Sequence, residues 1–221
     1  AHSYRGTHSN CRSEPARDGR DTVPDQTFAY TASPASTDLP TIKTMTEASM
    51  HPPILNLHQV ELEPLPEALA PEGETASRYQ QRMARVGQQL GSQKLGYRLY
   101  ALPPGMRGSP FHSHRVNEEM FYVVAGEGEV RLGAERFPIR EGDVIACPPG
   151  GPEKAHQIIN TSQAELRYLA VSTQQQPEIC EYPDSNKYAV MDNFTVDAEG
   201  NASGFVAVAR QADGVDYWDG E

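Results

Sequence analysis

The sequence predicts an all-β fold, an antiparallel barrel or sandwich built of short strands. Seven runs rich in β-branched and aromatic residues lie between residues 95 and 172, and turn residues separate them. No helical pattern occurs between these runs, which argues against a parallel α/β sheet. The predicted strands cover residues 95–102, 119–124, 128–132, 136–139, 143–146, 156–159 and 166–172.

The elements around these strands follow from local composition. Residues 54–70 contain several prolines and predict an extended arm, whereas residues 75–90 hold enough helix formers for a short helix that Gly91 closes. Gly133 and Ala134 supply the turn of a hairpin within the strand region. Near the end of the chain, residues 204–211 (GFVAVARQ) predict one further strand.

Composition divides the chain into four parts around a single predicted domain. Residues 1–50 hold few large aliphatic residues and show no regular period, so we expect them to be disordered. The chain opens without Met, and Met45 and Met50 stand just before the composition changes, which suggests a start site assigned too far upstream. We then expect an arm and short helix at 51–94, a barrel at 95–175 and an acidic C-terminal extension at 176–221.

Charge and cysteine content narrow the classes of partner. Lys and Arg number 19 against 30 Asp and Glu, and a net charge of −11 argues against the basic face that nucleic acid requires. No stretch reaches the roughly 20 apolar residues of a membrane span. The three cysteines, Cys11, Cys147 and Cys180, form no C-x-x-C pair and no even set, so we expect a reducing, cytoplasmic setting.

Two histidines one residue apart are the first sign of chemistry. Side chains at alternate strand positions share a face, so His112 and His114 point in one direction. Glu119 follows after four residues, and His156 begins a later strand. Imidazole and carboxylate together suit a divalent transition metal. The His-x-His pair alone is more often ordinary surface or core histidine, and Glu118 is expected to face away from Glu119.

The spacing of these residues, taken together, resembles the two sequence motifs of the cupin superfamily. The first cupin motif reads G(x6)HxH(x4)E(x6)G from Gly105 to Gly126, and the second reads G(x5)PxG(x5)H(x3)N from Gly142 to Asn160. Fifteen residues separate the two motifs, as in small microbial cupins. The first glycine lies one residue further from the histidines than usual, and three extra residues precede His156. The following Asn160 restores the register.

The resemblance implies a small jelly-roll β-barrel with one bound metal ion. Its ligands would be His112, His114, Glu119 and His156, and the ion would be Fe, Mn, Ni or Zn, among which spacing cannot choose. Four such ligands leave open positions for a substrate or for oxygen. Such barrels commonly dimerise, so we expect a homodimer in which the arm at 54–70 could be exchanged.

The flanking sequence resembles bacterial single-domain cupins described, by similarity, as sugar-phosphate isomerase-like. We therefore expect an enzyme acting on a small polar metabolite such as a sugar or a carboxylate or carbonyl compound, although no general base is identifiable. An Fe- or Mn-dependent dioxygenase or decarboxylase is one alternative, and a non-catalytic cupin that binds or senses a small ligand is another. Candidate substrate-binding residues are Arg98, Lys154 and Tyr168, the first two for a carboxylate or phosphate.

Overall fold

The structure is a computed structural model that describes residues 52–66, 69–196 and 202–221. These residues belong to one compact unit of the chain, Met45–Glu221. The expected disorder of residues 1–50 concerns residues outside the described part. The strands are β1 Glu63–Pro64, β2 Arg82–Ala84, β3 Leu95–Leu102, β4 Ser113–His114, β5 Glu119–Ala125, β6 Glu127–Leu132, β7 Glu135–Arg140, β8 Val144–Cys147, β9 His156–Ile159, β10 Leu166–Thr173, β11 Glu178–Tyr182, β12 Lys187–Val196 and β13 Ala202–Arg210.

The strands pair antiparallel in three sheets, which confirms the predicted all-β class. Six strands follow the order β1-β2-β3-β10-β5-β8, three follow β7-β6-β9, and four follow β13-β12-β11-β4. Each of the seven runs predicted between residues 95 and 172 forms a strand, with bounds that agree within one residue. The β6–β7 hairpin turns at Gly133 and Ala134, because Leu132 pairs with Glu135.

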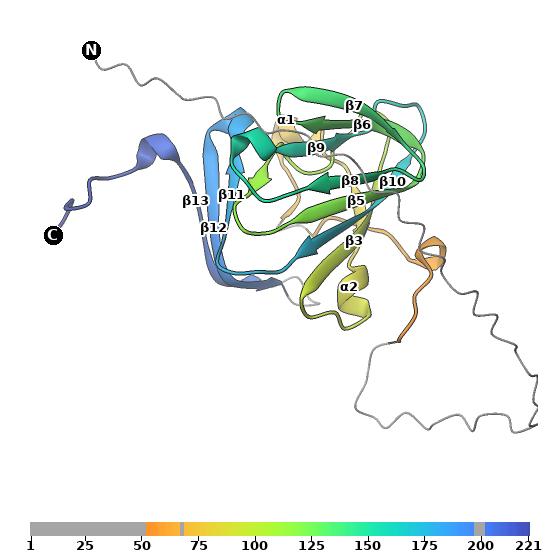
Figure 1. Ribbon diagram of the computed structural model, residues 1–221, viewed down its shortest axis with the longest axis horizontal. Coiled ribbons are helices and arrows are strands. Elements are labelled where there is room, and N and C mark those ends of the chain that lie inside the picture. Colours follow the sequence, from red (N-terminus) through yellow and green to blue (C-terminus); the bar gives the residue numbers. More distant parts are fainter. Residues whose placement is uncertain (1–51, 67–68, 197–201) are drawn as a thin grey trace, which may run out of the picture. The chain divides into compact units, whose positions relative to one another are not determined.

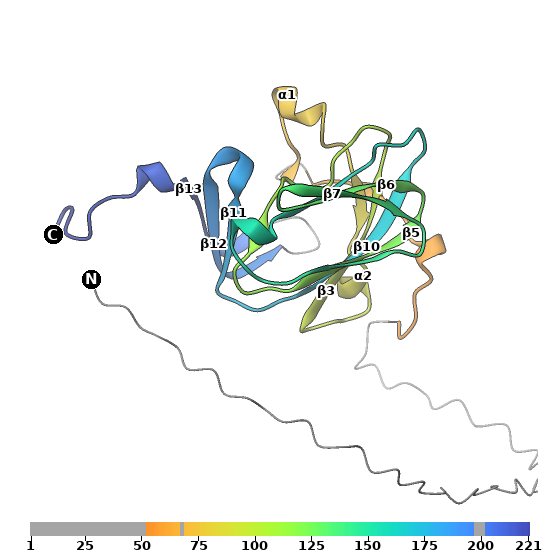
Figure 2. The same ribbon diagram turned by 45° about the horizontal axis from the view of Figure 1, so that its top comes forward.

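The core fills the space between the six-stranded and the three-stranded sheet. In Figure 2, β6 and β7 lie across the interior from β3 and β10. Side chains of β3, β10, β5 and β8 enter this interior from the six-stranded sheet, and β7, β6 and β9 contribute the facing ones from the three-stranded sheet. The cluster comprises Leu102, Phe121, Val123, Val130, Ile139, Ile145, Cys147, Ile158, Leu166 and Tyr168. The thiol of Cys147 is thus part of the core.

Asn160, the last residue of the second motif, ties the end of β9 to two neighbouring segments. Its side chain is fully buried. The amide nitrogen donates to the carbonyl oxygens of Leu102 (2.8 Å) and Ala164 (2.7 Å), and the amide oxygen accepts from Ser162 through both its N–H (3.0 Å) and its hydroxyl (2.8 Å). The residue that restores the motif register therefore has a structural role in the barrel.

The helix predicted over residues 75–90 is wrong in its extent. The segment contains two single-turn helices, α1 (Gly73–Ala76) and α2 (Val86–Gln89), with strand β2 between them. Met83 and Ala84 pair with β3 and are buried there, so sheet pairing and burial outweigh the helix propensity of the run. Gly91 does follow the helix α2, in a left-handed conformation (φ 71°).

The first part of the arm expected at 54–70 packs against the outer face of the barrel. A 3-10 turn at Leu57–Gln59 and the strand β1 lie within it. Its apolar residues Leu55, Leu57, Val60 and Leu62 contact a second cluster that includes Leu99 of β3. The helices of the described part of the chain are short, and none of them has the length and apolar character needed to span a membrane.

The C-terminal extension continues the sheet structure. The predicted strand at 204–211 corresponds to β13, which pairs with β12 and through it joins β11 (Figure 1). Strand β11 pairs in turn with β4, so that Cys180 lies opposite His114. The extension therefore borders directly on the strand that carries the histidine pair.

Candidate metal centre

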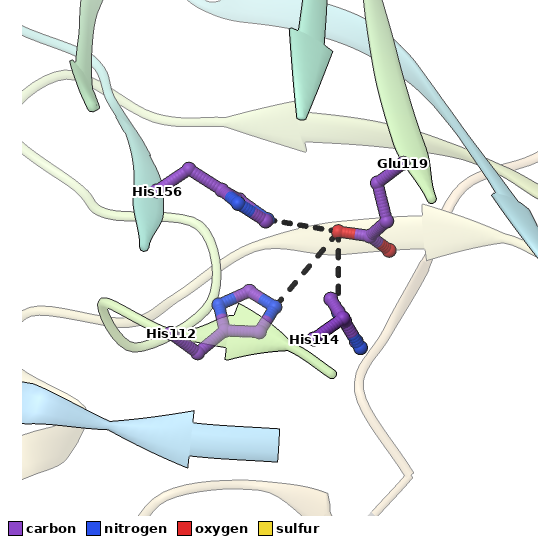
Figure 3. Close-up of side chains that lie close together, drawn as sticks. All are labelled: His112, His114, Glu119 and His156. Atoms are coloured by element: carbon purple, nitrogen blue, oxygen red, sulfur yellow. Dashed lines mark hydrogen bonds and ion pairs between the residues drawn. The ribbon is translucent and has the colours of Figure 1, made fainter. Parts of the chain in front are cut away.

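Four side chains from separate elements converge at one end of the barrel (Figure 3). His114 lies in β4, Glu119 begins β5 and His156 begins β9. His112 precedes β4 and forms an isolated bridge with His156, through backbone hydrogen bonds of 3.2 Å and 2.8 Å. The structure therefore brings together the four residues that the cupin spacing singles out.

The three imidazoles present their Nε2 atoms to one carboxylate oxygen. Oε2 of Glu119 lies 2.9 Å from Nε2 of His156, 3.4 Å from that of His114 and 3.9 Å from that of His112. The four candidate ligand atoms lie within 4.8 Å of one another. Ligands bound about 2.1 Å from one ion lie about 3 to 3.5 Å apart at tetrahedral or octahedral angles. The observed spacing fits a single metal ion.

The opposite ring nitrogens contact protein acceptors. Nδ1 of His112 lies 2.7 Å from the carbonyl oxygen of Pro110, and Nδ1 of His156 lies 3.4 Å from that of Lys154. A carbonyl oxygen can only accept, so a proton on Nδ1 satisfies each contact and leaves Nε2 as the nitrogen that could coordinate a metal, although in the metal-free site Nε2 of His156 hydrogen-bonds to Oε2 of Glu119 (2.9 Å). Nδ1 of His114 lies beside Cys180 Sγ (3.3 Å) and Glu178 Oε2 (3.5 Å).

One buried nitrogen at the site has no hydrogen-bond partner. Nε2 of His114 is inaccessible to solvent and, although it lies near Glu119, makes no hydrogen bond. A buried polar atom of this kind is costly unless something binds it. A metal ion would satisfy it, so the residues fit a bound metal.

The surroundings of these side chains shift their ionisation. Burial opposes the carboxylate form of Glu119, but the neighbouring imidazoles of His114 and His156 hold its pKa well below the usual range. Burial, together with His156, lowers the pKa of His112 to about 4. Burial would also lower the pKa of His114, yet its contacts with Cys180, Glu119 and Glu178 raise it to about 12. At neutral pH the site therefore combines an ionised carboxylate, a neutral His112 and a protonated His114.

The four side chains of the site differ in their exposure to solvent. The side chains of His112, His114 and Glu119 are 12%, 14% and 16% exposed, whereas that of His156 is 3% exposed. Phe121 stands edge-on to the His156 ring, and Tyr168 packs behind Phe121. A small molecule would therefore approach from the side of His112, His114 and Glu119.

The three candidate substrate-binding residues lie in different surroundings. Tyr168 is buried in the core, stacked on Tyr100, and does not border the accessible side. Lys154 is exposed, and its backbone carbonyl rather than its ammonium group contacts His156. Arg98 is also exposed, but it lies on β3 two residues before Tyr100 and four before Leu102, which enter the interior. Arg98 therefore shares the inward face of β3.

Sequence reasoning missed the side chains that β11 places beside the histidines. Glu178, Cys180 and Tyr182 occupy alternate positions of this strand, and all three contact the site. Glu178 and Cys180 contact His114, while the ring of Tyr182 stacks on that of His112 with centroids 6.1 Å apart. The alternation is visible in the run EICEY, but its pairing with β4 is not.

Comparison with known proteins agrees with this architecture. Residues 98–172 match the family Cupin_2, described as a cupin domain. An uncharacterized protein of Methanocaldococcus jannaschii is 36% identical over 61 residues, 28% of this chain and 46% of that protein. An oxalate-binding protein of Thermotoga maritima is 36% identical over 77 residues, 34% of this chain and 60% of that protein. The chain thus spans about half the length of these two relatives.

A similar solved structure covers more of the chain. It is that of a sugar phosphate isomerase of the cupin superfamily from Silicibacter pomeroyi, with 26% identity and a TM-score of 0.60. The match extends over 76% of this chain and 98% of that one. The protein therefore carries a cupin domain, and its expected membership of the cupin superfamily is confirmed.

Proposed function

We propose that the protein is a metal-dependent enzyme that acts on a small polar metabolite, a sugar or a related carboxylate or carbonyl compound, with isomerase-like chemistry. His112, His114, Glu119 and His156 would hold one divalent ion, Fe, Mn, Ni or Zn. One observation carries the proposal: three Nε2 atoms and one carboxylate oxygen meet at the spacing of ligands around a single ion. The similarity to a sugar phosphate isomerase over most of the chain supports the reaction class.

A bound ion of this kind would act as a Lewis acid toward a carbonyl or hydroxyl oxygen. The chain itself would orient the ligand. Because His156 and the apolar core close the site from behind, a polar ligand would reach the ion past His112 and His114. Four protein ligands leave room for such a ligand in a five- or six-coordinate site.

We propose that Arg98 binds an anionic group of the substrate. It pairs in register with Ala170 on β10, which pairs with Phe121 on β5, two residues after Glu119. Two strand spacings separate Arg98 from β5, roughly 10 Å, which a phosphorylated or carboxylated metabolite can bridge. Its guanidinium is exposed and suits two-point binding of carboxylate or phosphate.

A non-catalytic cupin that binds a small carboxylate is the second candidate. The similarity to an oxalate-binding protein favours it, and so does the lack of an assigned general base at the site. Such a protein would use the same metal ligands and would bind its ligand saturably without forming product. We propose a small-molecule ligand in either case and, given the acidic chain, no nucleic-acid partner.

Elemental analysis of the purified, untagged chain tests the metal site. We expect about one divalent ion per chain, lost in His112→Ala and in Glu119→Ala. The matched controls His58→Ala and Glu118→Ala change exposed residues of the same types and should keep the metal. Stoichiometric metal that survives both site substitutions would refute the assignment.

Incubation of the metal-loaded protein with phosphorylated aldoses and ketoses and with small dicarboxylates tests the reaction class. Isomerised product, without oxygen uptake or carbon dioxide release, supports the enzyme proposal. Oxygen uptake or carbon dioxide release would replace it with a dioxygenase or decarboxylase, and saturable binding with no product would favour the second candidate.

A further inference from the structure

Glu178 is a buried acid on the far side of His114 from the candidate metal. It is 3% exposed, and its Oε2 lies 3.5 Å from Nδ1 of His114, the nitrogen that faces away from Glu119. It belongs to β11, 64 positions along the chain from His114, and reaches the ring because β11 pairs with β4. None of the sequence motifs includes it.

Backbone N–H groups hold both carboxylate oxygens of Glu178 in place. Oε1 accepts hydrogen bonds from the backbone of Arg115 (3.1 Å), Val116 (3.2 Å) and Ile179 (2.7 Å). Oε2 accepts one from the backbone of Asn117 (2.7 Å) and another from the Asn117 side-chain amide. These N–H donors favour the ionised form of the Glu178 carboxylate.

The same contacts argue against a second metal ion between His114, Glu178 and Cys180, although their ligand atoms lie close together. Five N–H donors already occupy the oxygens of Glu178, and a metal ion there would have to displace them. The carboxylate is instead a fixed acceptor aimed at one ring nitrogen.

We propose that Glu178 is a positioning residue that keeps a proton on Nδ1 of His114 and thereby turns the Nε2 lone pair toward the metal. The inference rests on the proposed metal site. An ionised carboxylate can only accept, so the nitrogen beside it carries hydrogen, and the other nitrogen is then the one able to coordinate. The C-terminal extension thereby supports the metal site through β11.

Cys180 is the competing partner of the same nitrogen, with Sγ 3.3 Å from Nδ1. A thiol can donate as well as accept. If the thiol donated to Nδ1, the proton of a neutral ring would lie on Nε2, and that nitrogen could not bind a metal. Glu178 selects the opposite arrangement, in which Nδ1–H points to the carboxylate and the sulfur.

The substitution Glu178→Gln tests this role with little change in shape. Its amide oxygen can replace Oε1, which faces three N–H donors, and its NH₂ group then lies beside Nδ1 of His114, where the two hydrogen bonds that Oε2 accepts from Asn117 are lost. That group donates, so Nδ1 gives up its proton and the remaining ring proton lies on Nε2. Glu181→Gln is the matched control, because Glu181 lies on the same strand but pairs with Arg115 at 2.8 Å.

Two measurements on the full chain read out the change. The ¹⁵N shifts of the His114 ring should show a protonated Nδ1 in the wild type, both metal-free and zinc-loaded, and an unprotonated Nδ1 in metal-free Glu178→Gln. Titration with zinc should show affinity about 10- to 100-fold weaker in Glu178→Gln. Glu181→Gln and Cys180→Ala should bind zinc with affinity near that of the wild type.

An unprotonated Nδ1 in the wild type would overturn the proposal, and this result does not depend on any variant folding. Wild-type zinc affinity in a folded Glu178→Gln protein would overturn it as well, as would a loss of affinity in Cys180→Ala of the same size. Failure of the metal site itself would differ from all of these, because the wild type would then bind no zinc.

Discussion

Metal binding should release a proton from His114, which makes the affinity dependent on pH. In the metal-free protein the contacts with Cys180, Glu119 and Glu178 raise the pKa of His114 to about 12, so its ring is protonated at neutral pH. A divalent ion can bind Nε2 only after that proton leaves. His112, with its pKa lowered to about 4, and the ionised Glu119 have no proton to release.

The size of this effect follows from the protonation of His114. At pH 7.5 an imidazole with an ordinary pKa of about 6.5 would carry about 0.1 proton, whereas His114 should carry and release about one. Zinc affinity should then rise about tenfold from pH 7 to pH 8. Calorimetric titration in two buffers of different ionisation enthalpy measures the number of protons released. A release near 0.1 per zinc would refute the reasoning.

The same ionisation sets the sign of a stability change. A raised folded-state pKa gives stability that is full below the unfolded pKa of about 6.5 and is lost as the pH rises through the folded value. The metal-free protein should therefore lose thermal stability between pH 7 and pH 9. The zinc-loaded protein, in which no proton remains on Nε2 of His114, should lack this loss.

Two substitutions test the other assignments. Asn160→Ala removes four hydrogen bonds of a fully buried side chain and should lower the free energy of unfolding by about 3 to 5 kcal/mol in urea denaturation, against about 1 kcal/mol for the exposed cap Asn56→Ala. Equal losses would contradict a structural role for Asn160. Arg98→Ala should leave the metal content unchanged and weaken binding of a phosphate- or carboxylate-bearing ligand about 10- to 100-fold, whereas the exposed Arg136→Ala should not. An equal effect in both variants would remove Arg98 from the site.

The barrel strands could be predicted because their signal is local. Short β-type runs bounded by turn residues identified β3 and β9 with their observed bounds, Leu95–Leu102 and His156–Ile159. The helix prediction for residues 75–90 failed because Met83 and Ala84 pair with β3 and are buried there. Helix propensity is a local property and takes no account of such a contact. Homodimer formation and a cytoplasmic location stay predictions.

The arm shows a further limit of local reasoning. Its prolines predicted extended chain, and the structure agrees over Glu63–Pro64, which pairs with β2. Whether such an arm covers its own barrel or a partner's depends on which apolar surface it meets. Leu55 and Leu57 contact the cluster around Leu99 of the same chain, so the arm already has a partner surface here.

Two glutamates show why one part of the site was predictable and another was not. Glu119, which is partly buried, and Glu178, which is buried, are both acids that contact His114. Glu119 is five residues from His114, so the motif spacing itself identifies it. Glu178 reaches the same ring only through the pairing of β11 with β4, and no spacing rule encodes that pairing. Their roles follow from what faces their oxygens: imidazole Nε2 atoms at Glu119, where an ion could take the place of a proton, and backbone N–H donors at Glu178, which no ion can replace.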